Sequence, residues 1–114
     1  MQFLLLIYDQ EKRWNGLSQA QQNAETAEYG VFGREFAEAI RGGNALQPTA
    51  TAKTVRLRNG KPQVIDGPFA ETKEQLGGYY LVEAKDAEEA SAIAAKIPWA
   101  RHGSVEVRPI MTFA

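Results

Sequence analysis

The chain has 114 residues, a length that supports one hydrophobic core and predicts a single domain over residues 1–114. Thirteen basic and fourteen acidic side chains give a formal net charge of −1, which provides no basic field for nucleic acid or for an anionic membrane. The sequence contains no cysteine and one histidine, so disulfides, thiolate nucleophiles and cysteine-ligated metals are excluded.

The first segment, residues 2–8, predicts a strand that is buried on both faces. Its alternating side chains form two apolar sets: Phe3, Leu5 and Ile7, and Leu4, Leu6 and Tyr8. Such a strand is typical of the middle of a sheet. The segment is too short to span a bilayer and lacks the basic start and cleavage site of a signal peptide. We therefore expect a soluble, cytoplasmic protein.

A polar stretch from Asp9 to Gly16 predicts a loop that contains Trp14, and a long helix follows it. Ser18 is suited to cap this helix, with Gln21 at the capping-box position. Gly42-Gly43 is expected to end it after Arg41. The apolar side chains fall at spacings of three and four, which predicts this buried stripe: Ala20, Ala24, Ala27, Val31, Phe32, Phe36 and Ile40.

The middle of the chain predicts a β-hairpin. Residues 51–58 and 61–65 alternate in polarity around Asn59-Gly60, a pair that suits the positive φ angles of a type I′ turn. In the first of these strands we expect Val55 and Leu57 to point inward. Asp66-Gly67-Pro68 then predicts a turn.

The last third predicts two strands around a short helix. Residues 76–84 form an apolar strand in which Gly77-Gly78 indicates a bulge or a close backbone approach. Asp86 is expected to cap a helix that ends at Pro98 and buries this stripe: Ala87, Ala90, Ile93 and Ala94. Residues 104–111 alternate again, as a final strand does.

This order of elements predicts an α+β, ferredoxin-like fold with two helices on one face of a sheet. The first strand is apolar on both faces, yet two helices can cover only one of them. A symmetric partner is the simplest cover for the other face. We therefore predict a homodimer with its sheets packed face to face.

Residues 45–84 contain the unusual block Asp66-Gly67-Pro68-Phe69-Ala70-Glu71-Thr72-Lys73-Glu74, followed by Gly77-Gly78-Tyr79-Tyr80. Together with the first strand and Val105-Glu106-Val107-Arg108-Pro109-Ile110 near the end, this block resembles the YCII-related family and its Asp-Gly-Pro-Phe (DGPF) subgroup. The resemblance implies a dimeric α+β barrel with an extra β-hairpin. It also implies kinship with small cofactor-free enzymes related to a dehydrochlorinase, and frequent encoding beside extracytoplasmic-function sigma factors.

Asp66 and His102 are the candidate catalytic residues. The Asp66 carboxylate suits a general base or a substrate anchor, whereas the alternative is a structural Asx turn ahead of Gly67. His102 has the one side chain whose ordinary pKa lies near neutrality, and it could shuttle protons or simply lie on the surface. Relatives with proposed catalysis resemble one another in a His–Asp pair whose His lies on the first helix, and here residues 18–41 contain no His.

The charged candidates for substrate binding are Arg56, Arg108, Glu71 and Lys73. Arg56 and Arg108 are expected to share the sheet face away from the helices with Arg58 and Glu106. There they would hold a substrate anion or form ion pairs between two subunits. Glu71 and Lys73 would line the same cleft, with Glu74, or form a solvated turn.

Tyr8 and Tyr79 are the aromatic candidates for substrate binding. With Trp14 and Tyr80 they would form the wall of a site for a small ring-bearing ligand, although aromatic residues on strands also pack cores and interfaces. No phosphate loop, dinucleotide fingerprint or zinc spacing occurs in the sequence, so we expect no cofactor and no metal.

Two functions therefore stay open. One is a cofactor-independent enzyme that performs acid/base chemistry on a small polar or aromatic molecule, with Asp66 as its base. The other is a non-catalytic dimer that binds a metabolite or a regulatory partner, in a response governed by an extracytoplasmic-function sigma factor. A scaffold of this kind hosts both classes of role.

Overall fold

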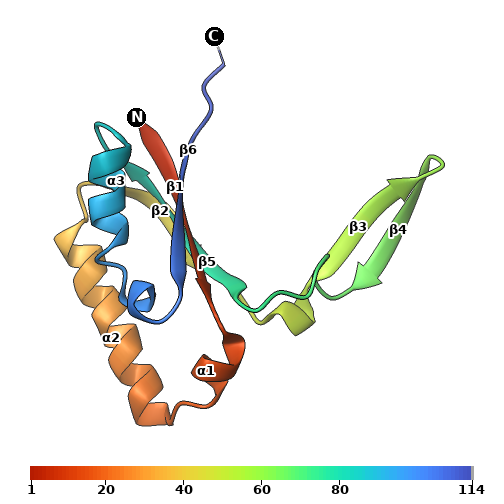
Figure 1. Ribbon diagram of the computed structural model, residues 1–114, viewed down its shortest axis with the longest axis horizontal. Coiled ribbons are helices and arrows are strands. Elements are labelled where there is room, and N and C mark those ends of the chain that lie inside the picture. The colour runs from red at the N-terminus through yellow and green to blue at the C-terminus, as the bar shows by residue number, and fades with distance from the viewer. Residues whose placement is uncertain (114) are drawn as a thin grey trace.

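The computed structural model describes residues 1–113 and is built around a four-stranded antiparallel sheet in the order β2-β5-β1-β6 (Figure 1). Its strands are β1 (Gln2–Asp9), β2 (Ile40–Ala45), β5 (Gln75–Glu83) and β6 (Ser104–Pro109). The main helices, α2 (Gln19–Glu35) and α3 (Ala87–Ala94), cover one face of the sheet. This β-α-β-β-α-β arrangement confirms the ferredoxin-like prediction.

Strand β1 lies in the interior of the sheet, as its two apolar faces predict. Phe3, Leu5 and Ile7 point toward the helices and are at most 4% exposed. Across the strand, Leu4 pairs with Leu81 of β5 and with Arg108 of β6, and Leu6 pairs with Tyr79 and Glu106. We call the half-buried face that carries Leu4 and Leu6 the open face, because no helix of the described chain covers it.

The second segment differs from the prediction in three ways. The expected loop contains a short helix, α1 (Glu11–Asn15). Ser18 caps α2 through a complete capping box with Gln21, as predicted, but the helix ends at Glu35 rather than at Arg41. The predicted cap Gly42-Gly43 lies inside the edge strand β2, which pairs with β5. A Cβ atom on Gly43 would lie 2.7 Å from the Tyr80 ring, so this glycine serves strand packing.

The buried stripe of α2 is also offset from the expected one. Four of the predicted positions are exposed: Ala20, Ala24, Ala27 and Val31. Phe32 and Phe36 face inward as predicted, and they share this face with Glu25 and Tyr29, so that the four residues follow at spacings of four, three and four. The prediction was wrong at these positions because it placed small alanines on the buried face of the helix and did not place the Glu25 carboxylate there. The aromatic residues fill more of the space above the sheet.

The C-terminal half follows the prediction, except that α3 ends at Ala94 rather than at Pro98. The Asp86 side chain caps α3 by accepting a hydrogen bond from the Glu89 amide at 2.9 Å. Ala90, Ile93 and Ala94 are buried beneath it, whereas Ala87 is exposed. Pro98 begins a 3₁₀ turn, η2 (Pro98–Arg101), that leads into β6. A second 3₁₀ turn, η1 (Thr49–Thr51), follows β2.

The predicted hairpin forms, but it stands away from the main sheet. Strands β3 (Lys53–Arg58) and β4 (Lys61–Asp66) make a separate two-stranded sheet, which we call the arm. Asn59 and Gly60 at its tip have φ angles of 52° and 74°. The expectation that Val55 and Leu57 point inward is wrong for this chain, because both are 65% exposed.

The arm gives the molecule an extended outline. The radius of gyration is 16.1 Å, against about 13 Å for a compact domain of this length. Among the helices of residues 1–113, none combines the length and the apolar character needed to cross a bilayer.

Candidate aromatic cavity

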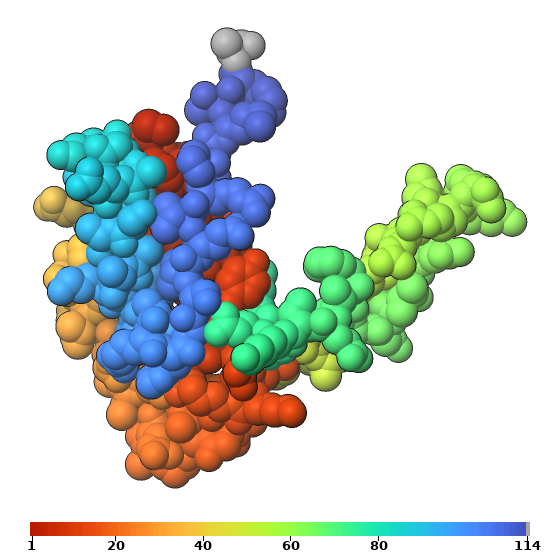
Figure 2. Space-filling model, in the orientation of Figure 1, coloured from red at the N-terminus to blue at the C-terminus, as the bar shows by residue number. Residues whose placement is uncertain are grey.

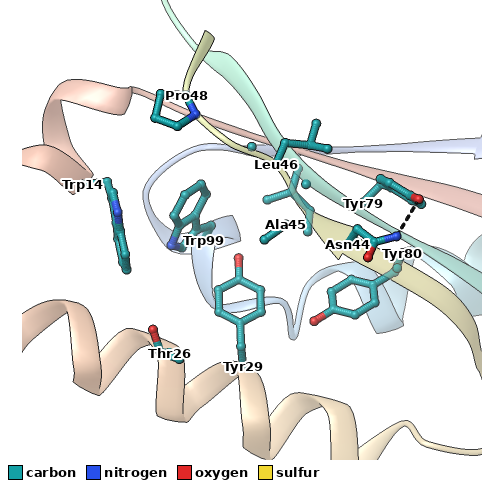
Figure 3. Close-up of a pocket in the computed structure, with 14 residues that line it drawn as sticks. Trp14, Thr26, Tyr29, Asn44, Ala45, Leu46, Pro48, Tyr79, Tyr80 and Trp99 are labelled. Atoms are coloured by element: carbon teal, nitrogen blue, oxygen red, sulfur yellow. Dashed lines mark hydrogen bonds between the residues drawn. The ribbon is translucent and has the colours of Figure 1, made fainter. Parts of the chain in front are cut away.

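A cavity of about 500 Å³ lies between α2 and the β2–β5 edge of the sheet (Figure 3). Its walls come from six elements and the loop after β2: Ile7, Trp14, Thr26, Tyr29, Gly43, Asn44, Ala45, Leu46, Pro48, Gly77, Gly78, Tyr79, Tyr80 and Trp99. None of these side chains carries a charge, and five of the lining residues are aromatic, contributed by four elements: α1, α2, β5 and η2. Within residues 1–113 this is therefore an uncharged, aromatic-lined cavity.

Trp99 is the central wall of the cavity. Its ring centroid lies 5.7 Å from that of Trp14 and 6.2 Å from that of Tyr29, the latter in an edge-on arrangement. Figure 3 shows the Tyr29 side chain rising from α2 between Trp99 and Tyr80. Tilted and edge-on contacts of this kind are the arrangements that ring quadrupoles favour.

The glycines of β5 explain how Trp99 fits against the sheet. The pairing of β1 with β5 runs from Ile7–Gly78 to Tyr8–Leu76 and leaves Gly77 as an extra, bulged residue. A Cβ atom on Gly77 would lie 2.7 Å from the Trp99 ring. The bulge and the close approach that the sequence suggests at Gly77-Gly78 both occur, and the indole of Trp99 occupies the space beside Gly77.

A buried charge network supports the cavity from beside Trp99. Arg13 donates two hydrogen bonds to Glu25, at 2.8 and 2.9 Å, and a third to Asp9 at 2.6 Å. The Trp99 indole donates to Glu25 at 2.9 Å, and the Arg13 guanidinium lies 5.7 Å from the Trp99 ring centroid. Since two carboxylates meet one guanidinium, the formal charge of this network is −1.

The hydrogen bonds of this network shift the pKa values of its members. The hydrogen bonds from Arg13 hold the pKa of Glu25 below its usual range, against the opposing effect of burial. The same pairing with Glu25 raises the pKa of Arg13. Both groups therefore stay ionised, and the Glu25 carboxylate is committed to holding Arg13 and Trp99 in place.

The tyrosine hydroxyls of the cavity are donors rather than bases. Burial raises the pKa of Tyr29 well above its ordinary value, and burial raises that of Tyr80 in the same direction. Both phenols therefore stay protonated at neutral pH. The Tyr79 ring lies on the open face, opposite Leu6, and its hydroxyl accepts a hydrogen bond from the Asn44 side chain at 2.9 Å.

The loop that carries Pro48 is fastened to α1 beside the cavity. The Glu11 carboxylate accepts hydrogen bonds from the Thr49 amide at 2.7 Å and from the Thr49 hydroxyl at 2.9 Å. The Glu11 amide in turn donates to the side chain of Gln75 at 2.9 Å. These contacts join the Trp14 wall and the Pro48 wall into one unit.

The structure brings the rings of two aromatic residues named from the sequence, Trp14 and Tyr80, to this cavity. Tyr79 is also among the lining residues, but its ring lies on the open face opposite Leu6. Tyr8 lies on the open face too, beside Leu76 and Ser104. Arg108 and Glu106 also lie on the open face, as predicted, and form an ion pair with each other at 2.8 Å.

The remaining predicted site residues lie apart from the cavity. Asp66 ends the arm at its base, where its side chain is 83% exposed and pairs with Lys53. Arg56 and Arg58 lie on the arm, so the expectation that they share a sheet face with Arg108 is wrong. Three further residues are exposed in loops: Glu71 and Lys73 before β5, and His102 after η2.

Sequence reasoning missed Tyr29, Trp99 and the network of Asp9, Arg13 and Glu25. A signal for the missed stripe existed in the spacing of Glu25, Tyr29, Phe32 and Phe36 along one helix face. Predicting this stripe from the sequence requires placing the carboxylate of Glu25 on the buried face of the helix. No local sequence pattern indicates that Arg13, twelve residues away, forms an ion pair with the Glu25 carboxylate.

Two comparisons with known proteins bear on this chain. The family model of the YCII-related domain matches residues 1–114. The chain is also similar to "Uncharacterized protein R00369" of Rhizobium meliloti (strain 1021), with 35% identity over 117 residues that cover 99% of this chain and 94% of the relative.

Proposed function

The chain belongs to the YCII-related domain family, and we propose that it binds a small, neutral, ring-bearing molecule in the aromatic cavity. The observation that carries this proposal is an uncharged cavity of about 500 Å³ with walls of Trp14, Tyr29 and Trp99. Small-molecule sites have volumes of about 300–1,000 Å³ and are predominantly apolar with a few polar groups. Both properties hold here.

The charge around the cavity favours a neutral ligand over an anion. The walls carry no cation within the described residues, and the network beside Trp99 has a formal charge of −1. An aromatic carboxylate would be desolvated in the cavity without a counterion, which is costly. The protonated Tyr29 hydroxyl supplies a donor for one ligand oxygen.

Binding accounts for these features better than catalysis within one chain does. The cavity walls hold no carboxylate, imidazole or amine that could act as a base, and the raised pKa of Tyr29 makes its phenol a poor one. Asp66 and His102 line no part of it. Acid/base chemistry at Asp66, a regulatory role beside a sigma factor and a cytoplasmic location stay predictions.

The homodimer remains part of the proposal. The open face carries the half-buried side chains of Leu4, Leu6, Tyr8 and Leu81. An apolar sheet face of this kind suits packing against the same face of a second copy.

The two tryptophans make ligand binding directly observable, because they are the only two in the sequence and both line the cavity. The indole N–H signals of ¹⁵N-labelled protein are followed during titration with 2-naphthol, a neutral probe, and with 2-naphthoate, its anionic counterpart. We expect 2-naphthol to shift both signals and to bind at least about 10-fold more tightly than 2-naphthoate, a difference of about 1.4 kcal/mol. Absence of any shift with either probe contradicts the proposal.

Substitutions on α2 locate the binding site. Thr26 lines the cavity and hydrogen-bonds only to its own helix, through the Gln22 carbonyl, so Thr26→Phe should fill the cavity without unfolding the chain. The adjacent Ala27 is exposed and lines no part of it. We expect Thr26→Phe to abolish 2-naphthol binding and Ala27→Phe to leave it unchanged. Equal behaviour of the two variants places binding elsewhere.

A further inference from the structure

The two faces of the arm differ sharply in chemistry. The register pairs Val55 with Val64 and Leu57 with Pro62, and side chains directly opposite each other share a face. These four residues form one continuous apolar face, which we call the inner arm face. The opposite face carries most of the polar and basic groups: Thr54, Arg56, Arg58, Lys61 and Gln63, with Ile65 among them.

The inner arm face has no cover within the described chain. Val55, Leu57 and Val64 are 65%, 65% and 61% exposed. Figure 2 shows the arm standing clear of the body, joined to it only at its base. An isolated two-stranded hairpin is at best marginally stable in water, and its stability needs a third strand or a packed hydrophobic face. The arm is therefore incomplete by itself.

Three observations favour a second copy of this chain as the cover. The arm projects on the side of the sheet opposite the helices, the side of the open face (Figure 1). The arm and the open face are thus two uncovered apolar surfaces on one side of the molecule. A twofold axis on that side would satisfy both in each subunit at once, as an isologous interface does.

The third observation is charge. Residues 53–66 contain four basic and one acidic side chain, a formal charge of +3. Since the whole chain has −1, the rest carries −4. Between two copies, the two basic arms repel each other, whereas the basic arm of one copy attracts the acidic remainder of the other.

We propose that each arm clasps the second subunit of a homodimer, packing Val55, Leu57, Pro62 and Val64 against the partner's body. This inference rests on the proposed homodimer and adds to it that the arm, together with the open face, holds the subunits together. It predicts that a charge on the inner arm face weakens the dimer, whereas a charge on the opposite arm face does not.

Sedimentation equilibrium of the full chain and of two variants with one added lysine tests the proposal. Val64→Lys changes the inner arm face, and Gln63→Lys changes the neighbouring position on the opposite face. We expect a wild-type dimer, a dissociation constant about 100-fold or more higher for Val64→Lys, and a change of less than about 3-fold for Gln63→Lys. Trp14 and Trp99 lie in the body, so their fluorescence verifies that each variant remains folded.

Hydrogen exchange of the wild type provides a test without substitution. The β3 and β4 amides should be protected at concentrations that favour the dimer and lose protection on dilution, whereas β1 stays protected. A wild-type dimer unchanged by Val64→Lys, or an arm unprotected in that dimer, overturns the clasp and leaves the sheet-face dimer standing. A monomeric wild type, or open-ended aggregation, overturns both. Equal weakening by the two lysine variants also overturns the clasp.

Discussion

Arg13 of α1 donates two parallel hydrogen bonds to the carboxylate of Glu25 in α2. This fork fixes α1 against α2, and α1 carries Trp14 to the cavity. The same Glu25 carboxylate holds the Trp99 indole. Two walls of the cavity thus depend on one buried ion pair.

Replacing Arg13 with methionine should destabilise the fold strongly. The substitution keeps most of the side-chain volume but leaves Asp9 and Glu25 buried without a counterion, which costs about 3–5 kcal/mol. Urea denaturation followed by tryptophan fluorescence measures the change. The matched control is Arg101→Met, which breaks a similarly forked pair with Glu28 on the exposed side of the same helix. It should cost far less than Arg13→Met, because the Arg101–Glu28 pair is exposed to solvent, and equal costs would show that burial is irrelevant.

The Glu25 carboxylate should also make the fold sensitive to acid. Its pKa is lowered from 4.5, chiefly by the hydrogen bonds from Arg13. A lowered pKa in the folded state stabilises the fold fully above the unfolded value, and this stability is lost as pH falls through the folded value.

Urea midpoints measured from pH 7 down to pH 3 test this dependence. We expect wild-type stability to fall below about pH 4.5 and Glu25→Gln to show a shallower fall over the same range, from a lower starting stability. The Glu28→Gln variant should keep the wild-type dependence nearly intact, since solvent screens that exposed pair. Parallel curves for wild type and Glu25→Gln would contradict the assignment.

Gly77→Ala should disturb the cavity through Trp99. The added methyl group would lie 2.7 Å from the indole ring, and overpacking of this kind costs about 1–3 kcal/mol. Because Trp99 must move, its indole N–H signal should shift together with the loss of stability. Gly33 of α2 has open space around its Cβ position, so Gly33→Ala should be neutral or stabilise by up to about 1 kcal/mol. An unshifted Trp99 signal in Gly77→Ala would disprove the contact.

Ser18→Ala should weaken the start of α2. The Ser18 hydroxyl accepts from the Gln21 amide at 3.1 Å, and the Gln21 side chain accepts from the Ser18 amide at 2.8 Å. Losing the cap should cost about 1 kcal/mol, and Ser18→Asp should restore most of it. Thermal unfolding followed by circular dichroism measures both variants, and a stability of Ser18→Asp no higher than that of Ser18→Ala would argue against the cap.

Features that depend only on neighbouring residues could be predicted from the sequence. The alternation in residues 2–8 identifies an interior strand, Asn59-Gly60 identifies the hairpin, and Ser18 and Asp86 identify two helix starts. Each follows from backbone geometry or from a side chain bonding within its own turn. Such interactions depend on the identity of only a few consecutive residues.

Features that depend on residues far apart in the sequence arise only in the folded chain. Residues 40–45 form a strand because β5 offers them an edge, which overrides the helical spacing that continues to Ile40. Glu25 faces inward because Arg13 and Trp99 meet it there, the latter from 74 residues away. The hairpin lies apart from the main sheet. The alternating polarity of its residues therefore predicts an apolar face but does not identify the surface against which that face packs. Burial and strand pairing are properties of the folded chain. The local spacing of residues indicates which side chains could form a contact but does not identify their distant partners.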